Sequence, residues 1–382
     1  MKLPVAFRAA GIAVGIKSQE ALDLGLITAE VPLYWALTST RNQVVAPCVS
    51  RNRARYSSGR TVHGVIVNSG NANCANGDQG IWDNEDFAGM AASALGLPQV
   101  QNMLTASTGI IGHRLPVARI RSGLSDLAEQ LGDDSEDFAK AILTTDTCRK
   151  QVAVTLRSGA RILGIAKGSG MIHPNMATML AFVMTDASIS QTALRELWPS
   201  LVERSFNQIT VDGDTSPNDM ALLLSSHQHN SDPGEFAEAL DAVCRQLAEK
   251  IAGDGEGATK LLVVEVKGGR SGEGARAAAR QVARSLLVKT AMHGNDPNWG
   301  RILTALGSSG AILDQSKVTI RLQDVLVYQG TPKEFEVTEL AAALDRDRVT
   351  IAIDLAAGEY TGSAWGCDLT ADYVRINADY HT

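Results

Sequence analysis

Residues 167–180 read KGSGMIHPNMATML. A lysine and two glycines form a flexible cationic turn at the start, and a proline then breaks the chain. Thr178 follows the small residue Ala177 and leads into an apolar run at 180–183. Two interpretations fit this pattern. The segment is a loop that enters a buried strand or helix, or it is a self-cleaving Ala–Thr junction.

Cleavage between Ala177 and Thr178 would make Thr178 the N-terminus of a second chain. An N-terminal threonine carries its own general base, because an unperturbed α-amine titrates near pH 8. The hydroxyl and the amine of one residue would then supply both a nucleophile and its base. The two pieces would comprise residues 1–177 and 178–382.

Apolar patterns around this segment predict a mixed α/β protein. Strands are expected at 62–67, 260–267, 316–322 and 349–354, the last two with the alternation of half-buried antiparallel strands. Helices are expected at 86–95, 116–131, 136–143, 191–202, 233–251 and 274–285, with Ser135 and Asp232 as N-caps for two of them. Because the two kinds of element alternate irregularly, a layered α/β sandwich is favoured over a regular βαβ winding.

Small and polar residues cluster in a set of short blocks that core packing does not require. Loops of this kind, held by a rigid scaffold, are where functional sites are usually built. The blocks lie at residues 68–77, 107–112, 167–180, 210–219, 253–260 and 295–301.

The block at 253–260, GDGEGATK, resembles a phosphate-binding loop superficially. Such a loop needs lysine followed by serine or threonine, whereas here Thr259 precedes Lys260. A turn that enters the strand starting at Lys260 is the better interpretation. Glu256 is unusual, because it stands between two glycines where neither a helix nor a strand calls for a carboxylate.

Other candidate sites have simpler explanations. Asp212, Asp214 and Asp219 could bind a divalent cation, but they lack EF-hand spacing, and aspartates in such turns commonly accept hydrogen bonds from the backbone. His173 and His293 stand in Gly/Pro-rich blocks without an evident serine or cysteine partner, which favours structural roles. The GxSxG motif of serine hydrolases does not occur.

Composition limits the class of protein. The chain has 382 residues and a formal net charge of −7, without a run of five basic residues, which argues against nucleic-acid binding. At about 150 residues per domain this length suggests two or three domains. Five scattered cysteines form no CxxC pair, which argues against a zinc site and suits a reducing, cytoplasmic location. The apolar run at 9–16 is too short to span a membrane.

The block at 167–180 resembles the self-cleavage signature of the ornithine acetyltransferase family, also called the glutamate N-acetyltransferase or ArgJ family. The resemblance continues in matching order from about residue 68 to residue 382. It is less close over the first 60 residues, where WALTSTRN at 35–42 departs from the family pattern. The matching motifs are NSGNAN, STGIIG, LTTDT, SFNQITVDGDTSPND, DGEGATK, DPNWGR and the C-terminal AWGCDLTADYVRINADYHT.

The resemblance implies an αββα-type layered sandwich related to a self-processing aminopeptidase, with a smaller C-terminal α/β part. It implies an α chain (1–177) and a β chain (178–382), assembled as an α₂β₂ heterotetramer. The implied activity transfers an acetyl group from N2-acetyl-L-ornithine to L-glutamate. No cofactor or metal is implied, although acetyl-CoA is a conceivable second acetyl donor.

The resemblance also assigns residues to roles. Thr178 matches the nucleophile, and Thr108 and Gly109 match the oxyanion hole. By charge, Lys167 suits a substrate carboxylate and Glu256 a substrate ammonium, although the sequence does not decide between these parts. The positions that match the substrate-binding residues are Thr144, Lys167, Thr178, Glu256, Asn377 and Thr382.

Two other classes of function stay open at this stage. A related amidohydrolase or aminopeptidase would use the same nucleophile and let water attack the ester. A non-enzymatic or metal-dependent binding protein would remain uncleaved.

The C-terminal segment is expected to be a strand that forms part of the substrate site. Val374 and Ile376 alternate with the polar Arg375 and Asn377, which is the pattern of a strand with one buried face. Asn377 would then lie on the polar side, with Thr382 close enough to fold back over the pocket.

Overall fold

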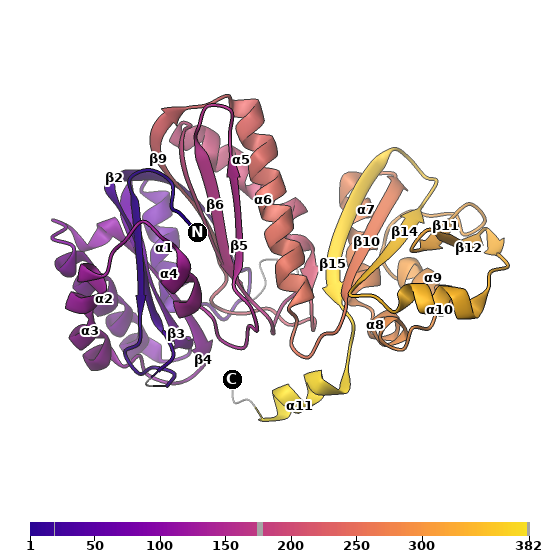
Figure 1. Cartoon of the computed structure of the whole chain (residues 1–382), viewed down its shortest axis with the longest axis horizontal. Coiled ribbons are helices and arrows are strands. Elements are labelled where there is room, and N and C mark those ends of the chain that lie inside the picture. The colour runs from indigo at the N-terminus through magenta and orange to yellow at the C-terminus, as the bar shows by residue number, and fades with distance from the viewer. Residues whose placement is uncertain (19, 174–178, 380–382) are drawn as a thin grey trace.

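The computed structural model describes residues 1–18, 20–173 and 179–379 and forms a layered sandwich joined to a smaller α/β unit (Figure 1). Ala177, Thr178 and Thr382 lie outside the described residues. Most of the smaller unit follows the sandwich along the chain, and helix α11 then runs back beneath the sandwich (Figure 1).

The sandwich contains a sheet with the strand order β4-β3-β2-β9-β7-β6-β5, and β1 pairs with β2. Its strands are β1 (Phe7–Ile12), β2 (Leu24–Ser39), β3 (Val62–Asn71), β4 (Met103–Ile110), β5 (Lys150–Thr155), β6 (Arg161–Lys167), β7 (Leu180–Ser188) and β9 (Met220–Asn230). Its helices are α1 (Pro47–Ser57), α2 (Gly77–Ala94), α3 (Val117–Glu129), α4 (Glu136–Ala141), α5 (Gln191–Arg204) and α6 (Pro233–Gly253), with 3₁₀ turns at Val100–Asn102 and Phe206–Gln208.

Strand β2 divides this sheet into two layers. Its first half pairs with β3 and its second half with β9, with a register shift between Thr28 and Leu33. The inner faces of the two layers share a buried cluster that includes Trp35, Phe138 and Phe182. Helices α2 and α3 pack against the outer face of one layer, and α5 and α6 against the outer face of the other (Figure 1). The predicted αββα sandwich is therefore confirmed.

The smaller unit is a mixed sheet with helices packed on one face, which confirms the expected C-terminal α/β part. Its strand order is β13-β12-β11-β14-β10-β15-β8. Its strands are β8 (Ile209–Thr210), β10 (Leu261–Gly269), β11 (Thr319–Leu322), β12 (Val325–Gln329), β13 (Thr331–Pro332), β14 (Arg348–Asp354) and β15 (Tyr360–Cys367). Its helices are α7 (Gly272–Arg284), α8 (Leu286–His293), α9 (Trp299–Gly307) and α10 (Val337–Leu344), followed by α11 (Ala371–Asp379).

Apart from the C-terminal strand, each strand and helix expected from the patterns is present, with differences in where the elements begin and end. The largest difference is helix α2, which begins at Gly77 rather than at residue 86. Asp232 caps α6 as predicted, since its carboxylate accepts a hydrogen bond from the Glu235 amide at 2.8 Å. Ser135 stands at the N-cap position of α4 as predicted, but its side chain makes no cap hydrogen bond, because its hydroxyl donates to the Met1 carbonyl instead.

The predicted C-terminal strand is wrong, because residues 371–379 form helix α11. The Thr370 hydroxyl accepts hydrogen bonds from the amides of Asp372 and Tyr373, as an N-cap does. Val374, one of the alternating apolar residues, is 65% exposed. Four alternating positions are too few to select a strand when neither face of the segment is buried.

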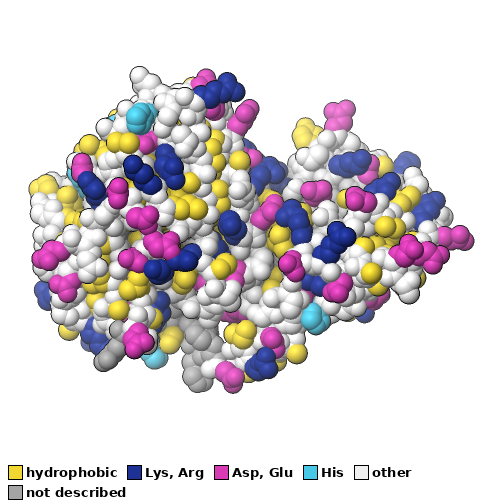
Figure 2. All heavy atoms as spheres, viewed as in Figure 1, with side chains coloured by type: hydrophobic (Ala, Val, Ile, Leu, Met, Phe, Trp, Pro, Cys, Tyr) yellow, Lys and Arg dark blue, Asp and Glu magenta, His cyan; other side chains and the backbone are white. Residues whose placement is uncertain are grey.

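Basic and acidic side chains are interspersed over the face of the molecule drawn in Figure 2, in keeping with the modest net charge of −7. Among the described residues, the structure contains no helix with the length and apolar character needed to span a membrane.

We predict that Gly164→Ala lowers the free energy of unfolding by about 1–3 kcal/mol, because it overpacks the contact between β6 and α6. A Cβ atom at Gly164 would lie 2.5 Å from Leu247 Cδ1 and 2.9 Å from Val243 Cγ1, and both neighbours are fully buried. Gly307→Ala in helix α9 is the control, because a Cβ there meets nothing within 4 Å. It should leave stability unchanged or raise it by up to about 1 kcal/mol. Urea unfolding of both variants tests the contrast, and equal effects would contradict it.

Candidate active site

A cavity of about 490 Å³ lies where β4 and β6 end, between the sandwich and helix α11. Its walls come from segments that are far apart in the sequence. The residues assigned by resemblance that line it are Thr108, Gly109, Thr144, Lys167, Glu256 and Asn377.

Thr108 and Gly109 stand near the end of β4, beside the parallel strand β3. Gly109 has a φ of 131°, and a Cβ atom there would lie 2.3 Å from the carbonyl carbon of Gly70. The close approach of the two strand ends therefore requires glycine at position 109. This packing holds the backbone of the predicted oxyanion hole at the cavity wall.

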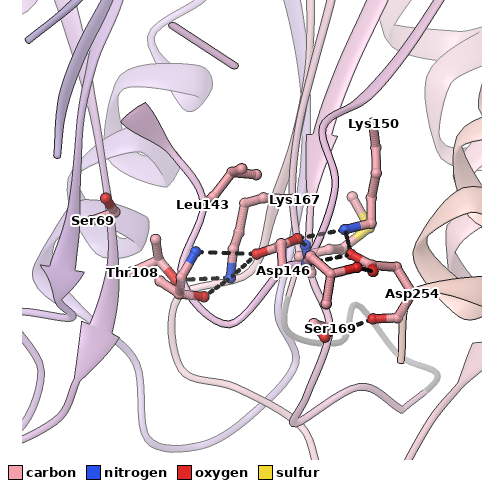
Figure 3. A network of polar contacts seen from close by, with 12 residues as sticks. Ser69, Thr108, Leu143, Asp146, Lys150, Lys167, Ser169 and Asp254 are labelled. Carbon is pink, nitrogen blue, oxygen red and sulfur yellow. Dashed lines mark hydrogen bonds and ion pairs between the residues drawn. The ribbon is translucent and has the colours of Figure 1, made fainter. Parts of the chain in front are cut away.

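Lys167 is the last residue of β6, and its side chain is 3% exposed. Its ammonium donates to Thr144 Oγ1 at 2.7 Å and to Thr108 Oγ1 at 3.4 Å (Figure 3). Burial lowers the pKa of Lys167, and the nearby Asp146 carboxylate opposes that shift. The cavity thus contains a cation held by two hydroxyl groups.

Glu256 lies in the glycine-rich loop after α6. Its amide donates to the Ser169 carbonyl at 3.0 Å, and its carboxylate accepts a hydrogen bond from Asn377 Nδ2 at 2.9 Å. A Cβ atom at Gly170 would lie 2.3 Å from Glu256 Oε2, so glycine makes room for the carboxylate. Although α11 is not the predicted strand, it does bring Asn377 to the cavity.

The loop at 253–260 enters strand β10, as the turn interpretation expects. The Lys260 ammonium is buried and donates to the carbonyls of Met292 (3.0 Å) and Leu344 (2.9 Å) and to the Asn295 side chain. This lysine therefore serves the internal packing of the smaller unit rather than a phosphate group.

In the acidic block at 210–219, Asp212 and Asp219 accept hydrogen bonds from the backbone, as predicted. Asp212 accepts them from the amides of Met171 (2.6 Å) and Ile172 (2.9 Å), and Asp219 accepts one from the Met179 amide (3.0 Å). Burial raises the pKa of Asp212 to about 6. Within the described ranges, no group of three or more His, Cys, Asp or Glu residues is placed to hold a metal ion.

Both candidate histidines have protein partners, which agrees with structural roles. His173 Nδ1 lies 3.3 Å from Thr210 Oγ1, and His293 Nδ1 lies 2.9 Å from Asp368 Oδ2. Burial and two nearby arginines lower the pKa of His173 to about 4.

The sequence patterns did not point to several residues at or near the cavity, some of which act on it only through contacts with other side chains. Lys150 and Asp254 form a buried ion pair next to Asp146, a member of the LTTDT motif. Tyr373 and Asn218 also line the cavity. Lys150 follows Asp146 at a spacing of four residues, but nothing in this pattern shows that the pair is buried.

The junction itself, Ala177–Thr178, and Thr382 lie outside the described residues. The chain that follows the junction is held beside the cavity. Met179 is buried with its amide bonded to Asp219, and Leu180 pairs with Lys167 across the β6–β7 ladder.

Known proteins resemble this chain along its full length. The family model described as "ArgJ family" matches residues 8–382. The arginine biosynthesis bifunctional protein ArgJ of Thermus thermophilus is 51% identical, with 100% of both chains covered. The protein of the same name from Deinococcus radiodurans is 48% identical and covers 99% of this chain and 97% of its own. The protein of that name from Bacillus halodurans has a crystal structure, and its sequence is 43% identical. The match has a TM-score of 0.51 and covers 53% of this chain and 100% of that chain.

We predict that the Asp212 carboxyl group makes the folded protein more stable as the pH falls from about 7 to about 4. Its pKa in the folded state, about 6, exceeds the value of about 3.9 for an unfolded chain, so the folded state binds the proton more tightly. Asp212→Asn removes this group. The free energy of unfolding of the wild type should therefore rise relative to that of the variant over this range. Urea titrations at several pH values measure the difference, and a constant difference would refute the prediction.

Proposed function

Because the chain belongs to the ArgJ family, we propose that it transfers the acetyl group of N2-acetyl-L-ornithine to L-glutamate. The products would be ornithine and N-acetylglutamate, in arginine biosynthesis. One observation supports this proposal most strongly: a single cavity is lined by Thr108, Gly109, Lys167 and Glu256. These residues come from separate segments of the chain, at residues 108–109, 167 and 256. The fold brings a cation, a carboxylate and the end of strand β4 together.

Thr178 is the proposed nucleophile, set free by cleavage of the Ala177–Thr178 bond. The placement of Met179 and Leu180 beside the cavity supports this assignment. The size of the Bacillus halodurans crystal chain supports it too. All of that chain is matched by 53% of this one. The piece after residue 177 would have 382 − 177 = 205 residues, about 54% of this chain, which is nearly the same fraction.

The proposed reaction has two acyl-transfer steps. Thr178 Oγ attacks the acetyl carbonyl while the α-amine of Thr178 takes the hydroxyl proton. The oxyanion lies against donors at Thr108 and Gly109, one of which contributes about 3 kcal/mol in comparable sites. The C–N bond then breaks, and ornithine leaves with the proton returned by the amine. The amine of glutamate attacks the acetyl-threonine ester and regenerates the hydroxyl, which gives ping-pong kinetics.

The charged groups of the cavity suit amino-acid substrates. In our proposal, Lys167 binds the α-carboxylate, and Glu256, positioned by Asn377, binds the side-chain ammonium of ornithine. The Thr144 hydroxyl, 2.7 Å from the Lys167 ammonium, is close enough to share the same carboxylate. Thr382 completes the proposed substrate site.

Further parts of the proposal concern assembly and acetyl donors. We expect two chains, 1–177 and 178–382, held together because β7 pairs with β6 and β9 pairs with β2. An α₂β₂ assembly and a cytoplasmic location are proposed as well, the latter in keeping with the free thiols of the described cysteines. Acetyl-CoA as a second acetyl donor is consistent with the word "bifunctional" in the names of the relatives.

We predict that Thr178→Ala yields one uncleaved, inactive chain, because it removes the hydroxyl that attacks in both processing and transfer. Thr178→Ser keeps a hydroxyl and should retain part of the cleavage. Intact-mass spectrometry of the wild type should find two pieces, the second beginning Thr178-Met179-Leu180. An active wild type that remains one full-length chain would refute the assignment.

The function itself is tested by product analysis with purified, cleaved protein. We expect N-acetylglutamate and ornithine in equal amounts from N2-acetyl-L-ornithine and L-glutamate. Release of free acetate in the absence of glutamate would favour the amidohydrolase or aminopeptidase alternative. A parallel reaction with acetyl-CoA and glutamate decides whether there is a second donor.

A further inference from the structure

Lys150, at the start of β5, is buried at the centre of a charge network. Its side chain is 0% exposed, and its ammonium lies 2.6 Å from Asp146 Oδ1 and 2.5 Å from Asp254 Oδ2 (Figure 3). Both carboxylates are also almost completely buried. Removing three charged groups from water costs free energy. A protein interior tolerates them only when they are paired and hydrogen-bonded, as they are here.

Asp146 is shared unequally by two lysines. It lies 2.6 Å from Lys150, but its other oxygen is 3.8 Å from the Lys167 ammonium. Its carboxylate also accepts hydrogen bonds from the amides of Gly168 (2.6 Å) and Thr144 (3.1 Å). Burial raises the pKa of Asp146, but the charges of Lys167 and Lys150 and its hydrogen bonds outweigh burial and lower the pKa to about 2, so this group stays ionised at neutral pH.

This unequal sharing places the counter-ion of Lys167, Asp146, beyond hydrogen-bond distance. Within the described residues, the Asp146 contact at 3.8 Å is its ion pair, and its hydrogen bonds go to the neutral hydroxyls of Thr144 and Thr108. An ammonium held by hydroxyls at a cavity wall can still pair with an incoming anion. The short contact of Asp146 and its hydrogen bond from a lysine go to Lys150 instead, at 2.6 Å.

Lys150 also reaches the other side of the cavity through Asp254. The Asp254 carboxylate accepts a hydrogen bond from the Thr147 amide at 3.1 Å, and its carbonyl accepts one from Ser169 Oγ at 2.6 Å. The Ser169 carbonyl in turn accepts the hydrogen bond of the Glu256 amide. The Lys150 ammonium therefore contacts both Asp146, next to Lys167, and Asp254, which begins the loop that contains Glu256.

We propose that Lys150 is a positioning residue that makes the enzyme selective for substrates with an α-carboxylate. By pairing closely with Asp146, it keeps that carboxylate from closing on the Lys167 ammonium, which can then bind the substrate. This inference rests on the proposed function, in which Lys167 binds that carboxylate. Without the charge of Lys150, Asp146 turns to Lys167 as its nearest cation, and the substrate must then compete with a buried carboxylate for the same ammonium.

The test compares two acetyl donors that differ by one carboxylate, N2-acetyl-L-ornithine and N-acetylputrescine. In a ping-pong reaction, kcat/KM for the donor does not depend on the acceptor, so the ratio of the two kcat/KM values measures selectivity for the carboxylate. In cleaved Lys150→Met protein, we expect this ratio to fall about tenfold or more, the size typical of a hydrogen bond to a charged group. Adding Asp146→Asn in the same chain removes the competing carboxylate and should restore much of the ratio.

Lys289→Met is the matched control. Lys289 is another buried lysine, 1% exposed, and its ammonium donates to the Cys367 carbonyl in the smaller unit rather than to Asp146. Its loss should lower stability and leave the ratio unchanged. Should Lys150→Met fail to fold, Lys150→Gln, whose amide can still donate to one carboxylate, gives the same readout with a smaller fall.

The outcomes separate this inference from the proposed function. If Lys167→Met does not lower the ratio, the carboxylate assignment of Lys167 is wrong, and the inference fails with it. If Lys167→Met lowers the ratio but the Lys150 variants slow both donors equally or change nothing, Lys150 has a purely structural role. In that case the proposed function stands without this inference.

Discussion

The packing of apolar side chains between the two sheet layers determines where the strands end, and the cavity is built from those ends. Trp35, Phe138 and Phe182 are fully buried between the layers. Removing one such aromatic side chain typically costs about 3–5 kcal/mol. The register that this core imposes brings the end of β4, with Thr108, opposite the end of β6, with Lys167. Polar groups near the cavity depend on this core for their positions, although none of them belongs to it.

Close backbone approach and buried charge then shape the site within that frame. Glycine at positions 109 and 170 lets a neighbouring strand and a carboxylate come closer than any side chain would allow. Lys150 behind the wall is paired with Asp146 and Asp254, so these buried charges do not have to be neutralised by solvent. A cavity built in this way can present one cation and one carboxylate at a fixed separation, which suits a zwitterionic amino acid.

The pairing of strands in the two layers bears on the proposed cleavage. Residues before and after position 177 contribute neighbouring strands to the same sheet, with β6 beside β7 and β2 beside β9. The ladder hydrogen bonds and the shared core do not depend on the peptide bond at 177. After the proposed cleavage, these contacts would hold the two pieces together.

The sequence by itself determined the elements with strong local patterns, and its motifs supplied the family and most of the site. The amphipathic period predicted helices such as α6, and unusual blocks such as STGIIG and DGEGATK marked residues that do line the cavity. The local pattern misled at residues 374–377, where alternation over four positions predicted a strand. The segment is an exposed helix whose first turn is capped by the Thr370 hydroxyl. The tertiary structure alone decided that Lys150, Asp146 and Asp254 share one buried network. Burial and the distances between charges depend on which distant segments pack together, and no local pattern in the chain encodes that information.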